Sequence, residues 1–382
     1  MKRLRHTTWP AGRRLFALSA LLLAVGCGSA TRESSTAQVE TWRFAIEEST
    51  GSVQHKYALR FKELIEERTG GQVEVIVYPY GTLGTSTHMT EQLNLGVIEF
   101  AMASPGSLGK FIPELQAFLL HFVLPVDERQ TKRMLSDPEL VADLDQLYAP
   151  KNLKLLSIYS EGEMVWTLKK EVRTPDDFQG VKMRVMTSPI LLAAYDAYGA
   201  SATPMPYSEV YSGLQLNMID GQVNPVFAIE RQKFHEVTSC MVFPGHASFI
   251  TTCAANRRFI DRLAPERREL VADVIAELND YIFDVQTRLQ TERLKTILRD
   301  KSRQQQPLTV IGDLDEFVDS LTADERQELI DENEFVTLRP ALTEVEREQF
   351  RAASEEVRDV YQEIGGTQSG DVLDRLISES AP

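Results

Sequence analysis

Three polar side chains stand where predicted strands end and the next turn or helix begins. Glu48 follows the strand at residues 42–46, Arg184 ends "VKMRV", and Asn224 ends "GQVN" before Pro225. In open α/β sheets, ligands bind beyond the carboxyl ends of the strands. An arginine at such a place can hold a carboxylate through two parallel charge-assisted hydrogen bonds. These residue types favour a site that binds a small acidic ligand.

Each of the three residues also has a purely structural interpretation. Arg184 can be a solvated strand residue or an ion-pair partner of one of the many acids. Glu48 can stabilise the dipole at a helix start, and asparagine before proline is common turn chemistry. Placement alone leaves these alternatives open.

Patterns for catalysis are scarce in this chain. It contains no G-x-S-x-G, G-x-G-x-x-G or G-x-x-x-x-G-K-[ST] motif. None of its six histidines has metal-ligand spacing to a cysteine or another histidine. We therefore expect no catalytic residue, metal or cofactor, and a protein that is not an enzyme.

The elements that would position these side chains alternate between strand and helix. The first half reads as strand, helix, strand, helix, strand from residue 42 to residue 104, and a similar unit runs from about 155 to 249. This order predicts two α/β domains with parallel strand pairs. A helical pattern from about 265 to 300 is longer than one domain needs, so we expect it to brace both.

The chain begins with a predicted export signal. Residues 1–26 carry five basic residues and then an apolar run too short to span a bilayer, which is typical of a signal peptide. "LLLAVGC" resembles a lipobox, so Cys27 is the expected lipidated residue, and residues 27–40 form an anchor and a flexible tether. We expect a periplasmic or cell-surface protein; the export route, general or twin-arginine, stays open.

The charge of the mature chain restricts its partners. Five of the 41 basic residues lie in the signal, which leaves 36 against 56 acidic residues and a formal charge of −20. Such a surface repels nucleic acid, so none is expected as a partner. An acidic ligand would need a locally basic pocket.

Two cysteines remain after Cys27. Cys240 and Cys253 both lie in apolar, strand-like sequence. In an oxidising compartment they can form a disulfide, but two buried thiols are equally compatible with the sequence.

Several ordered motifs resemble one protein family over about residues 42–300. They are "FAIEESTGSVQHKYALRFKELIEERTGGQVEVIVYPYGTLG", "EQLNLGVIEFAMASPGSLGKFIPE", "GVKMRVMTSP", "GASATPMPYSEVYSGLQLNMIDGQVNP" and "FHEV". Together they resemble substrate-binding proteins of TRAP transporters, the DctP-like family. The resemblance implies a two-lobed periplasmic-binding-protein-like fold, with two α/β domains joined by a hinge and braced by a long helix.

The resemblance also implies how the chain is divided. Lobe I is expected at residues 41–161 plus about 250–289, and lobe II at 162–249 plus about 290–382. A segment at about 302–336 looks inserted relative to the family pattern. A solute would bind between the lobes and pass to the integral-membrane permease subunits.

The family pattern assigns roles to individual residues. The arginine of "KMRV" holds the substrate carboxylate, which places that role on Arg184, and the asparagine of "DGQxNP" places a role on Asn224. "FAIEES", "EGEM" and "SPG" are nearest to the branch that binds ectoine-like zwitterions, in which Glu48 would meet the cationic group. The expected ligand-binding residues are Arg184, Asn224, Glu48, Tyr207, Phe227, Phe249 and Ser107.

The sequence departs from that branch in its aromatic cage. Ser107 and Ala228 stand where aromatic residues are expected, and Tyr207 replaces a tryptophan. The expected solute is therefore a small organic carboxylate, either a zwitterion or a C4-dicarboxylate. Two alternatives are a lipoprotein that feeds a sensor and, with less support, an exported α/β enzyme.

Overall fold

The computed structural model describes residues 39–380, whose strands form two separate sheets. The five-stranded sheet has the order β2-β1-β3-β10-β4, and the seven-stranded sheet has the order β12-β11-β9-β5-β8-β6-β7. The bounds of the first sheet are β1 Glu40–Ala45, β2 Val73–Tyr78, β3 Phe100–Ala103, β4 Leu153–Glu163 and β10 Ser248–Asn256. Those of the second are β5 Val165–Leu168, β6 Lys182–Val185, β7 Ser201–Pro204, β8 Gly221–Asn224, β9 Cys240–Val242, β11 Leu308–Ile311 and β12 Val336–Arg339.

Helices pack around both sheets. Up to β10 they are α1 Val53–Arg68, α2 Ser86–Leu95, α3 Pro105–Leu108, η1 Pro113–Leu119, α4 Glu128–Leu135, α5 Pro138–Tyr148, η2 Ala149–Lys151, η3 Pro175–Phe178, α6 Pro189–Ala197, η4 Tyr207–Glu209, α7 Val210–Gln215, α8 Val226–Arg231 and η5 Phe234–Val237. After β10 they are α9 Arg257–Arg262, α10 Pro265–Gln304, α11 Asp315–Asp319, α12 Ala323–Arg326, η6 Gln327–Asp331, α13 Glu344–Ser354, α14 Glu356–Ile364 and α15 Ser369–Ser380.

The first sheet confirms the expected parallel pairing. β1 is parallel to both β2 and β3, whereas β10 runs antiparallel to β3 and β4. Trp42 and Phe44 of β1 are fully buried because they alternate toward the apolar face of α1. Helix α1 begins at Ser52, whose side chain accepts a hydrogen bond from the His55 backbone N–H.

The second sheet aligns the strands that carry Arg184 and Asn224. Strand β6 is parallel to β8, and Arg184 lies opposite Gln222. Two residues further along β8, Asn224 is its last residue. Both side chains therefore lie near the carboxyl ends of neighbouring parallel strands, where an open sheet offers a binding site.

The chain crosses between the two sheets three times, once through α10 and twice through short connections that lie close together. Strand β4 ends at Glu163 and β5 begins at Val165, while β9 ends at Val242 and β10 begins at Ser248. Strands β4 and β10 pair with each other in the first sheet, and β5 and β9 pair with each other in the second. The two short connections, β4 to β5 and β9 to β10, therefore run side by side. Such adjacent short connections form the hinge of the two-lobed fold.

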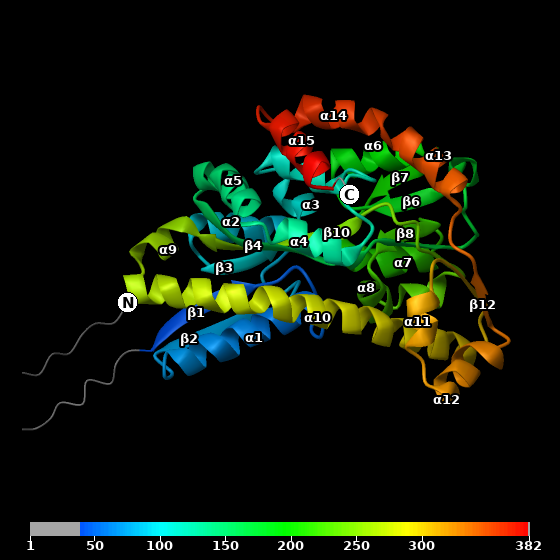
Figure 1. Ribbon diagram of the computed structural model, residues 1–382, viewed down its shortest axis with the longest axis horizontal. Coiled ribbons are helices and arrows are strands. Elements are labelled where there is room, and N and C mark those ends of the chain that lie inside the picture. Colours follow the sequence, from blue (N-terminus) through cyan, green and yellow to red (C-terminus); the bar gives the residue numbers. More distant parts are fainter. Residues whose placement is uncertain (1–38, 381–382) are drawn as a thin grey trace, which may run out of the picture. The chain divides into compact units, whose positions relative to one another are not determined.

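Helix α10 braces both lobes, as the sequence predicts. In Figure 1 it runs as one continuous helix across the molecule, from α9 at one end to the region of α11 and α12 at the other. Its side chains from Val271 to Leu289 join the apolar cluster of the first sheet and α1. Those from Leu294 to Leu298 join the cluster of the second sheet. This change between Leu289 and Leu294 supports the proposed lobe boundary near residue 290.

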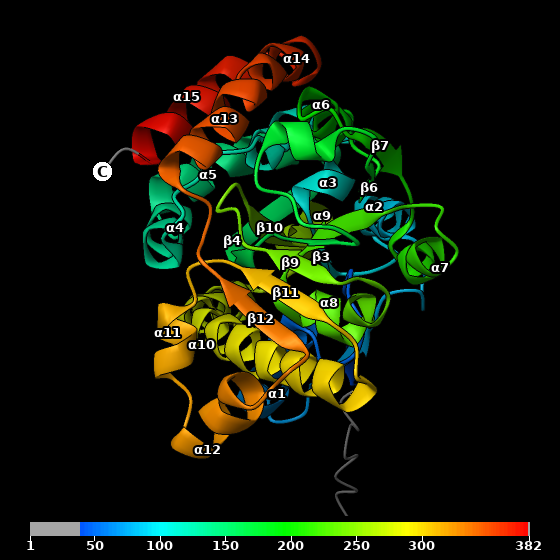
Figure 2. The same cartoon turned by 90° about the vertical axis from the view of Figure 1, so that its right-hand side faces the viewer.

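The last third of the chain contacts both lobes. The segment proposed as an insertion contributes β11, which pairs with β9 and β12, and α11 and α12, which lie beside them in Figure 2. Helix α14 then packs on α6, but α15 packs on η1 and α4. Helix α15 therefore departs from the assignment of residues about 290–382 to the second lobe.

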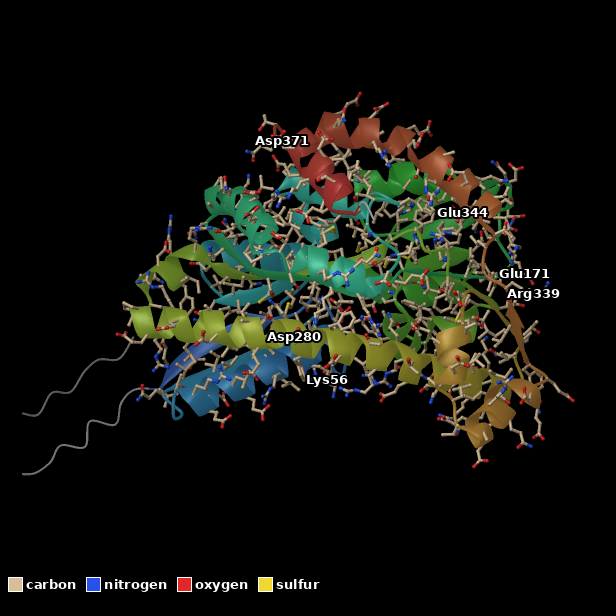
Figure 3. All side chains as sticks on the ribbon, in the orientation of Figure 1. Lys56, Glu171, Asp280, Arg339, Glu344 and Asp371 are labelled. Carbon is tan, nitrogen blue, oxygen red and sulfur yellow. The ribbon has the colours of Figure 1, made fainter. Side chains whose placement is uncertain are left out.

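The surface of the described residues is strongly charged. Lys56, Asp280 and Glu344 are exposed on α1, α10 and α13, and Figure 3 labels them. Exposed Arg339 on β12 lies 3.4 Å from Glu171. Such solvated pairs contribute little to the free energy of unfolding.

The two cysteines of the described chain do not pair. Cys240 on β9 and Cys253 on β10 are both free and buried, in different sheets and in different apolar clusters. The disulfide alternative is therefore wrong, because each side chain points into the core of its own layer. Burial raises the pKa of both thiols to about 12.

Both thiols should consequently be unreactive in the folded protein. In a Cys27→Ser chain, Ellman's reagent should detect almost no thiol under native conditions and two after unfolding without reductant, because only the exposed thiolate reacts. The melting temperature should not change on adding dithiothreitol. Detection of no thiol after unfolding would show that a disulfide forms.

Candidate functional site

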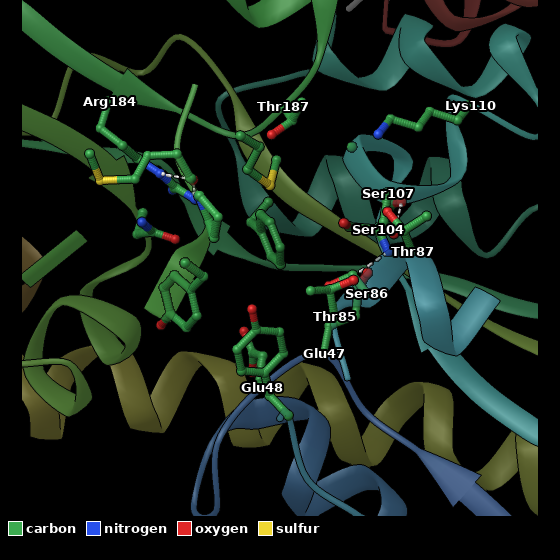
Figure 4. A pocket seen from close by; sticks show the side chains of 18 residues that line it. Glu47, Glu48, Thr85, Ser86, Thr87, Ser104, Ser107, Lys110, Arg184 and Thr187 are labelled. Atoms are coloured by element: carbon green, nitrogen blue, oxygen red, sulfur yellow. Dashed lines mark hydrogen bonds between the residues drawn. The ribbon is translucent and has the colours of Figure 1, made fainter. Parts of the chain in front are cut away.

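A cavity of about 230 Å³ lies between the two sheets and receives side chains from both. Glu48 reaches it from the turn after β1, and Arg184 and Asn224 reach it from β6 and β8. Six of the seven ligand-binding residues expected from the sequence line this one cavity: Glu48, Ser107, Arg184, Tyr207, Asn224 and Phe249. Figure 4 shows the cavity with Arg184 and Glu48 on different sides.

The Arg184 guanidinium is buried without an anionic partner among residues 39–380. It is 2 % exposed, and its Nε and Nη2 atoms donate to the Met205 carbonyl at 3.0 and 2.8 Å. Burial lowers the pKa of Arg184 to about 10, so the side chain keeps its charge at neutral pH. A buried charge that lacks a counter-ion is costly. The site is therefore incomplete until an anion enters.

A chain of hydrogen bonds through Asn224, Gln222 and Thr167 lies beside Arg184. The Asn224 Nδ2 atom donates to Gln222 Oε1, and the Gln222 Nε2 atom donates to Thr167 Oγ1. These bonds hold the Asn224 amide at the cavity wall. An amide held in this way can align a ligand carboxylate against the guanidinium.

Glu48 lies on the first-lobe side of the cavity and is 7 % exposed. Burial and the negative charge of Glu161 raise the pKa of Glu48 well above its usual value. Its Oε2 atom has no hydrogen-bond partner within the part of the chain that the structure describes. This free acceptor is suited to a ligand group that donates hydrogen bonds.

Several lining residues were missed by the sequence reasoning. Glu47 lines the cavity and accepts a 2.7 Å bond from the Ser104 backbone N–H. Lys110 lies on the far side from Arg184 in the view of Figure 4. The adjacent acids after β1 were a signal for Glu47, and the motif "SPG" at the end of β3 was one for Ser104 and Gly106. Nothing local marked the others, which are Tyr80, Thr85, Ser86, Thr87, Lys110, Met186, Thr187, Met205 and Pro206.

Two further expectations are corrected by the structure. Phe227 does not line the cavity, since it is 2 % exposed and packs with Ala228 in the apolar cluster of α1 and α10. The pair Ser188-Pro189 is also typical of a helix cap followed by a first-turn proline, and α6 does begin at Pro189, but the Ser188 hydroxyl donates to Gln116 Oε1 at 3.2 Å and makes no capping bond. Helix direction explains the first error: in α8 the side chain of Phe227 turns toward α10.

Residues 39–380 contain no helix long and apolar enough to cross a membrane. Over the same range, no group of three or more His, Cys, Asp or Glu side chains is arranged to hold a metal ion.

Two α/β lobes, a hinge and a cavity with unpaired charges between the lobes together define a solute-binding protein. The model of the DctP family, described as bacterial extracellular solute-binding protein, family 7, matches residues 44–324. The chain belongs to this family. Its members are the solute-binding components of TRAP transporters, which deliver small solutes to membrane permease subunits.

Curated relatives agree over most of their length. The chain is 39% identical to the ectoine/5-hydroxyectoine-binding periplasmic protein UehA of Ruegeria pomeroyi, over 75% of this chain and 84% of that protein. It is 37% identical to the ectoine-binding periplasmic protein TeaA of Halomonas elongata, over 69% and 77%. It is 30% identical to the C4-dicarboxylate-binding periplasmic protein DctP of Rhodobacter capsulatus, over 69% and 79%.

Solved structures share the fold. An apo open TRAP solute-binding protein from Marinobacter aquaeolei has a TM-score of 0.74 at 36% identity, covering 88% of this chain and 99% of that one. The ectoine-binding protein of the Halomonas elongata TeaABC transporter has a TM-score of 0.76 at 31% identity, covering 89% and 99%. The expected two-lobed fold and family are confirmed.

Replacing Arg184 should weaken ligand binding without unfolding the protein. Arg184→Ala should cost about 2–5 kcal/mol of affinity because it leaves a buried carboxylate unpaired. Arg184→Lys should also bind more weakly, since lysine keeps the charge but loses the planar fork.

Calorimetry with the tightest ligand of a thermal-shift panel measures both effects. Arg60→Ala is the control, because Arg60 pairs with Glu63 and Glu277 on the surface, away from the cavity. Unchanged affinity in Arg184→Ala would exclude the residue as the carboxylate anchor.

Proposed function

We propose that this protein captures a small zwitterion, with the ligand carboxylate on Arg184 and the ligand cation near Glu48. One observation carries the proposal. The buried guanidinium of Arg184 and the buried carboxyl group of Glu48 line the same cavity, and within residues 39–380 neither forms an ion pair. A ligand with one charge of each sign pairs both groups at once.

A dicarboxylate fits this arrangement less well. Its second carboxylate would approach Glu47 and Glu48, which line the cavity and lack any bonded lysine or arginine in the described chain. Like charges in a buried site repel strongly. A zwitterion also agrees with the ligands named for the relatives from Ruegeria and Halomonas.

The proposed zwitterion need not have the shape of ectoine. Ser107 lies in the cavity at a position where the ectoine-type pattern expects an aromatic ring. Serine and threonine side chains dominate that side, including Thr85, Ser86 and Thr87. Small hydroxyl groups leave more space and more hydrogen-bonding capacity than a ring does, which favours a larger or more polar zwitterion.

Membrane attachment is a further part of the proposal. Cys27 and the export signal lie outside the described residues, so the lipobox-like "LLLAVGC" is the support for a lipid anchor. The relatives are named as periplasmic proteins. A lipidated Cys27 would keep the binding protein close to its permease, which raises its local concentration there.

Removal of the Glu48 charge should discriminate between the two ligand classes. In wild type, ectoine or an amino-acid-like zwitterion should bind more tightly than a C4-dicarboxylate. Glu48→Gln should weaken zwitterion binding by about tenfold or more, because it leaves a desolvated cation without its counter-charge. Dicarboxylate binding should not weaken in the same variant.

Isothermal calorimetry measures this comparison, with Glu99→Gln as the control because Glu99 pairs with Arg43 and does not line the cavity. The proposal of a zwitterionic ligand would be rejected if a dicarboxylate bound most tightly to wild type and if Glu48→Gln left the affinity for zwitterions unchanged.

Substitution of Cys27 should release the protein from membranes. Cys27→Ser should shift the exported chain from the membrane fraction to the soluble fraction, because a serine cannot carry the thioether-linked lipid. Ligand affinity should stay unchanged, since the cavity is built from residues beyond 39. An intact mass without acyl groups in the wild-type chain would contradict the anchor.

A further inference from the structure

Three carboxyl groups meet on the first-lobe side of the cavity. Glu47 and Glu48 line the cavity from the turn after β1, and Glu161 of β4 is fully buried behind them. The sequence reasoning did not identify Glu161, which lies more than a hundred residues further along the chain. Only the tertiary structure brings these acids together.

Gln54 of α1 ties this group of acids together. Its Nε2 atom donates to Glu161 Oε1 at 3.0 Å, and its Oε1 atom accepts from the Glu47 backbone N–H at 2.7 Å. The same Nε2 atom lies 3.3 Å from Thr251 Oγ1. Because Gln54 is fully buried, these bonds fix Glu161 in place.

One oxygen of each acid nevertheless lacks a partner. Glu47 Oε1, Glu48 Oε2 and Glu161 Oε2 are buried and accept no hydrogen bond within residues 39–380. Orphaned buried oxygens are uncommon in folded proteins and call for an explanation. Such oxygens are satisfied by a proton on a neighbouring acid or by a donor on a ligand.

No protein cation neutralises these acids in the described part of the chain. Lysine, arginine and histidine form ion pairs elsewhere but with none of the three. The neighbouring elements contribute mostly neutral polar groups and weak acids. The uncharged or weakly acidic groups are Gln54 and Tyr57 of α1, Tyr80 after β2, Tyr159 of β4, Cys253 and Thr251 of β10, Gln286 and Gln290 of α10, Tyr207 of η4, and the serines 52, 86, 104 and 107. Two cations, Arg184 and Lys110, also line the cavity, but within residues 39–380 neither forms an ion pair with these acids.

The electrostatics of the pair favour one bound proton at neutral pH. Burial, together with the charge of Glu161, raises the pKa of Glu48, and burial raises the pKa of Glu161 to about 7. Burial also raises the pKa of Glu47, although hydrogen bonds from Ser107 and Ser104 oppose this effect. Two adjacent carboxyl groups in a dry site cannot easily both ionise.

We infer that Glu48 and Glu161 share one proton in the empty protein, and that the cationic group of the ligand takes the place of that proton. Binding then releases one H⁺ to solvent, and the pair becomes fully ionised around the ligand cation. The inference rests on the proposed zwitterion. In this scheme Glu161 is a positioning residue that acts through Glu48, not a ligand contact.

The pH dependence follows from this exchange. At any pH at which the empty pair holds its proton, that proton must be expelled on binding, so the association constant for a zwitterion should fall by up to tenfold for each unit by which the pH is lowered. At a higher pH, at which the empty pair has already ionised, the affinity should be constant. A ligand without a cationic group would release no proton, because nothing would then replace the proton between the two acids.

Proton release can be measured directly with ectoine as the probe. Calorimetry at about pH 6 in phosphate and in Bis-Tris, which differ in ionisation enthalpy, reports the number of protons exchanged. Wild type should release about one proton per ectoine bound. In Glu161→Gln the release should be near zero, since the amide donates permanently to Glu48, and the affinity should not vary between about pH 5.5 and 8.

Glu163→Gln is the matched control. Glu163 lies on the same strand and is half-buried, and its pKa is raised to about 7, but it accepts from the Gly245 backbone N–H and does not line the cavity. Its substitution should leave proton release unchanged. If Glu163→Gln released no proton on binding ectoine, the proton would be assigned to Glu163 and the inference would be overturned. Ectoine binding by wild type without release of a proton would overturn it as well.

A ligand-free measurement separates this inference from the proposed function. Stability should fall as pH rises from about 4.5 to about 7, because the folded pair holds a proton that the unfolded chain has lost. Glu161→Gln should show a shallower fall in melting temperature across that range. If the melting temperature of wild type and of Glu161→Gln fell equally steeply with pH, the shared proton would be overturned. If the two slopes differed but no zwitterion bound, the shared proton would stand, and only the proposed ligand class and the release of the proton on binding would be rejected.

Discussion

The structure depends on opposite charges that are buried in one cavity and kept apart by two lobes. Arg184 is held by the Met205 carbonyl in the second lobe, and Glu47 is held by the Ser104 amide in the first. Neither lobe supplies a counter-ion for its own charge among the described residues. A ligand that carries the complementary groups therefore stabilises the closed arrangement far more than an ordinary surface contact would.

The connections between the lobes suit this role. Two short strand crossings lie side by side, so relative motion of the lobes requires backbone change at only a few residues near Met164 and Gly245. Helix α10 limits the motion because it is packed into the apolar cores of both lobes. The family assigns this architecture to capture and delivery of a solute, and the charged cavity adds the requirement that the solute carry a carboxylate.

Local sequence patterns predicted most of the framework. Alternating apolar residues identified β1 and β6, and helical spacing identified α1 and nearly the full extent of α10. Placement at strand ends correctly brought Glu48, Arg184 and Asn224 to one cavity, because the carboxyl ends of β1 in one sheet and of the parallel strands β6 and β8 in the other face that cavity. Strands, helices and their ends could be predicted because they depend on the spacing of residues that are close together in the sequence.

The contacts between distant segments could not be read in the same way. Phe227 was assigned to the site but packs against α10, and Cys240 and Cys253 proved to lie in different sheets. Glu161 of β4 is a neighbour of Glu48 only in the folded chain, in which β4 lies beside the turn after β1. Short-range patterns in the sequence identified Glu48, Arg184 and Asn224 and the strands that hold them, but not Glu47 or Glu161. Only the tertiary structure decided which charges are buried together, because burial and pairing arise from packing between elements far apart in the chain.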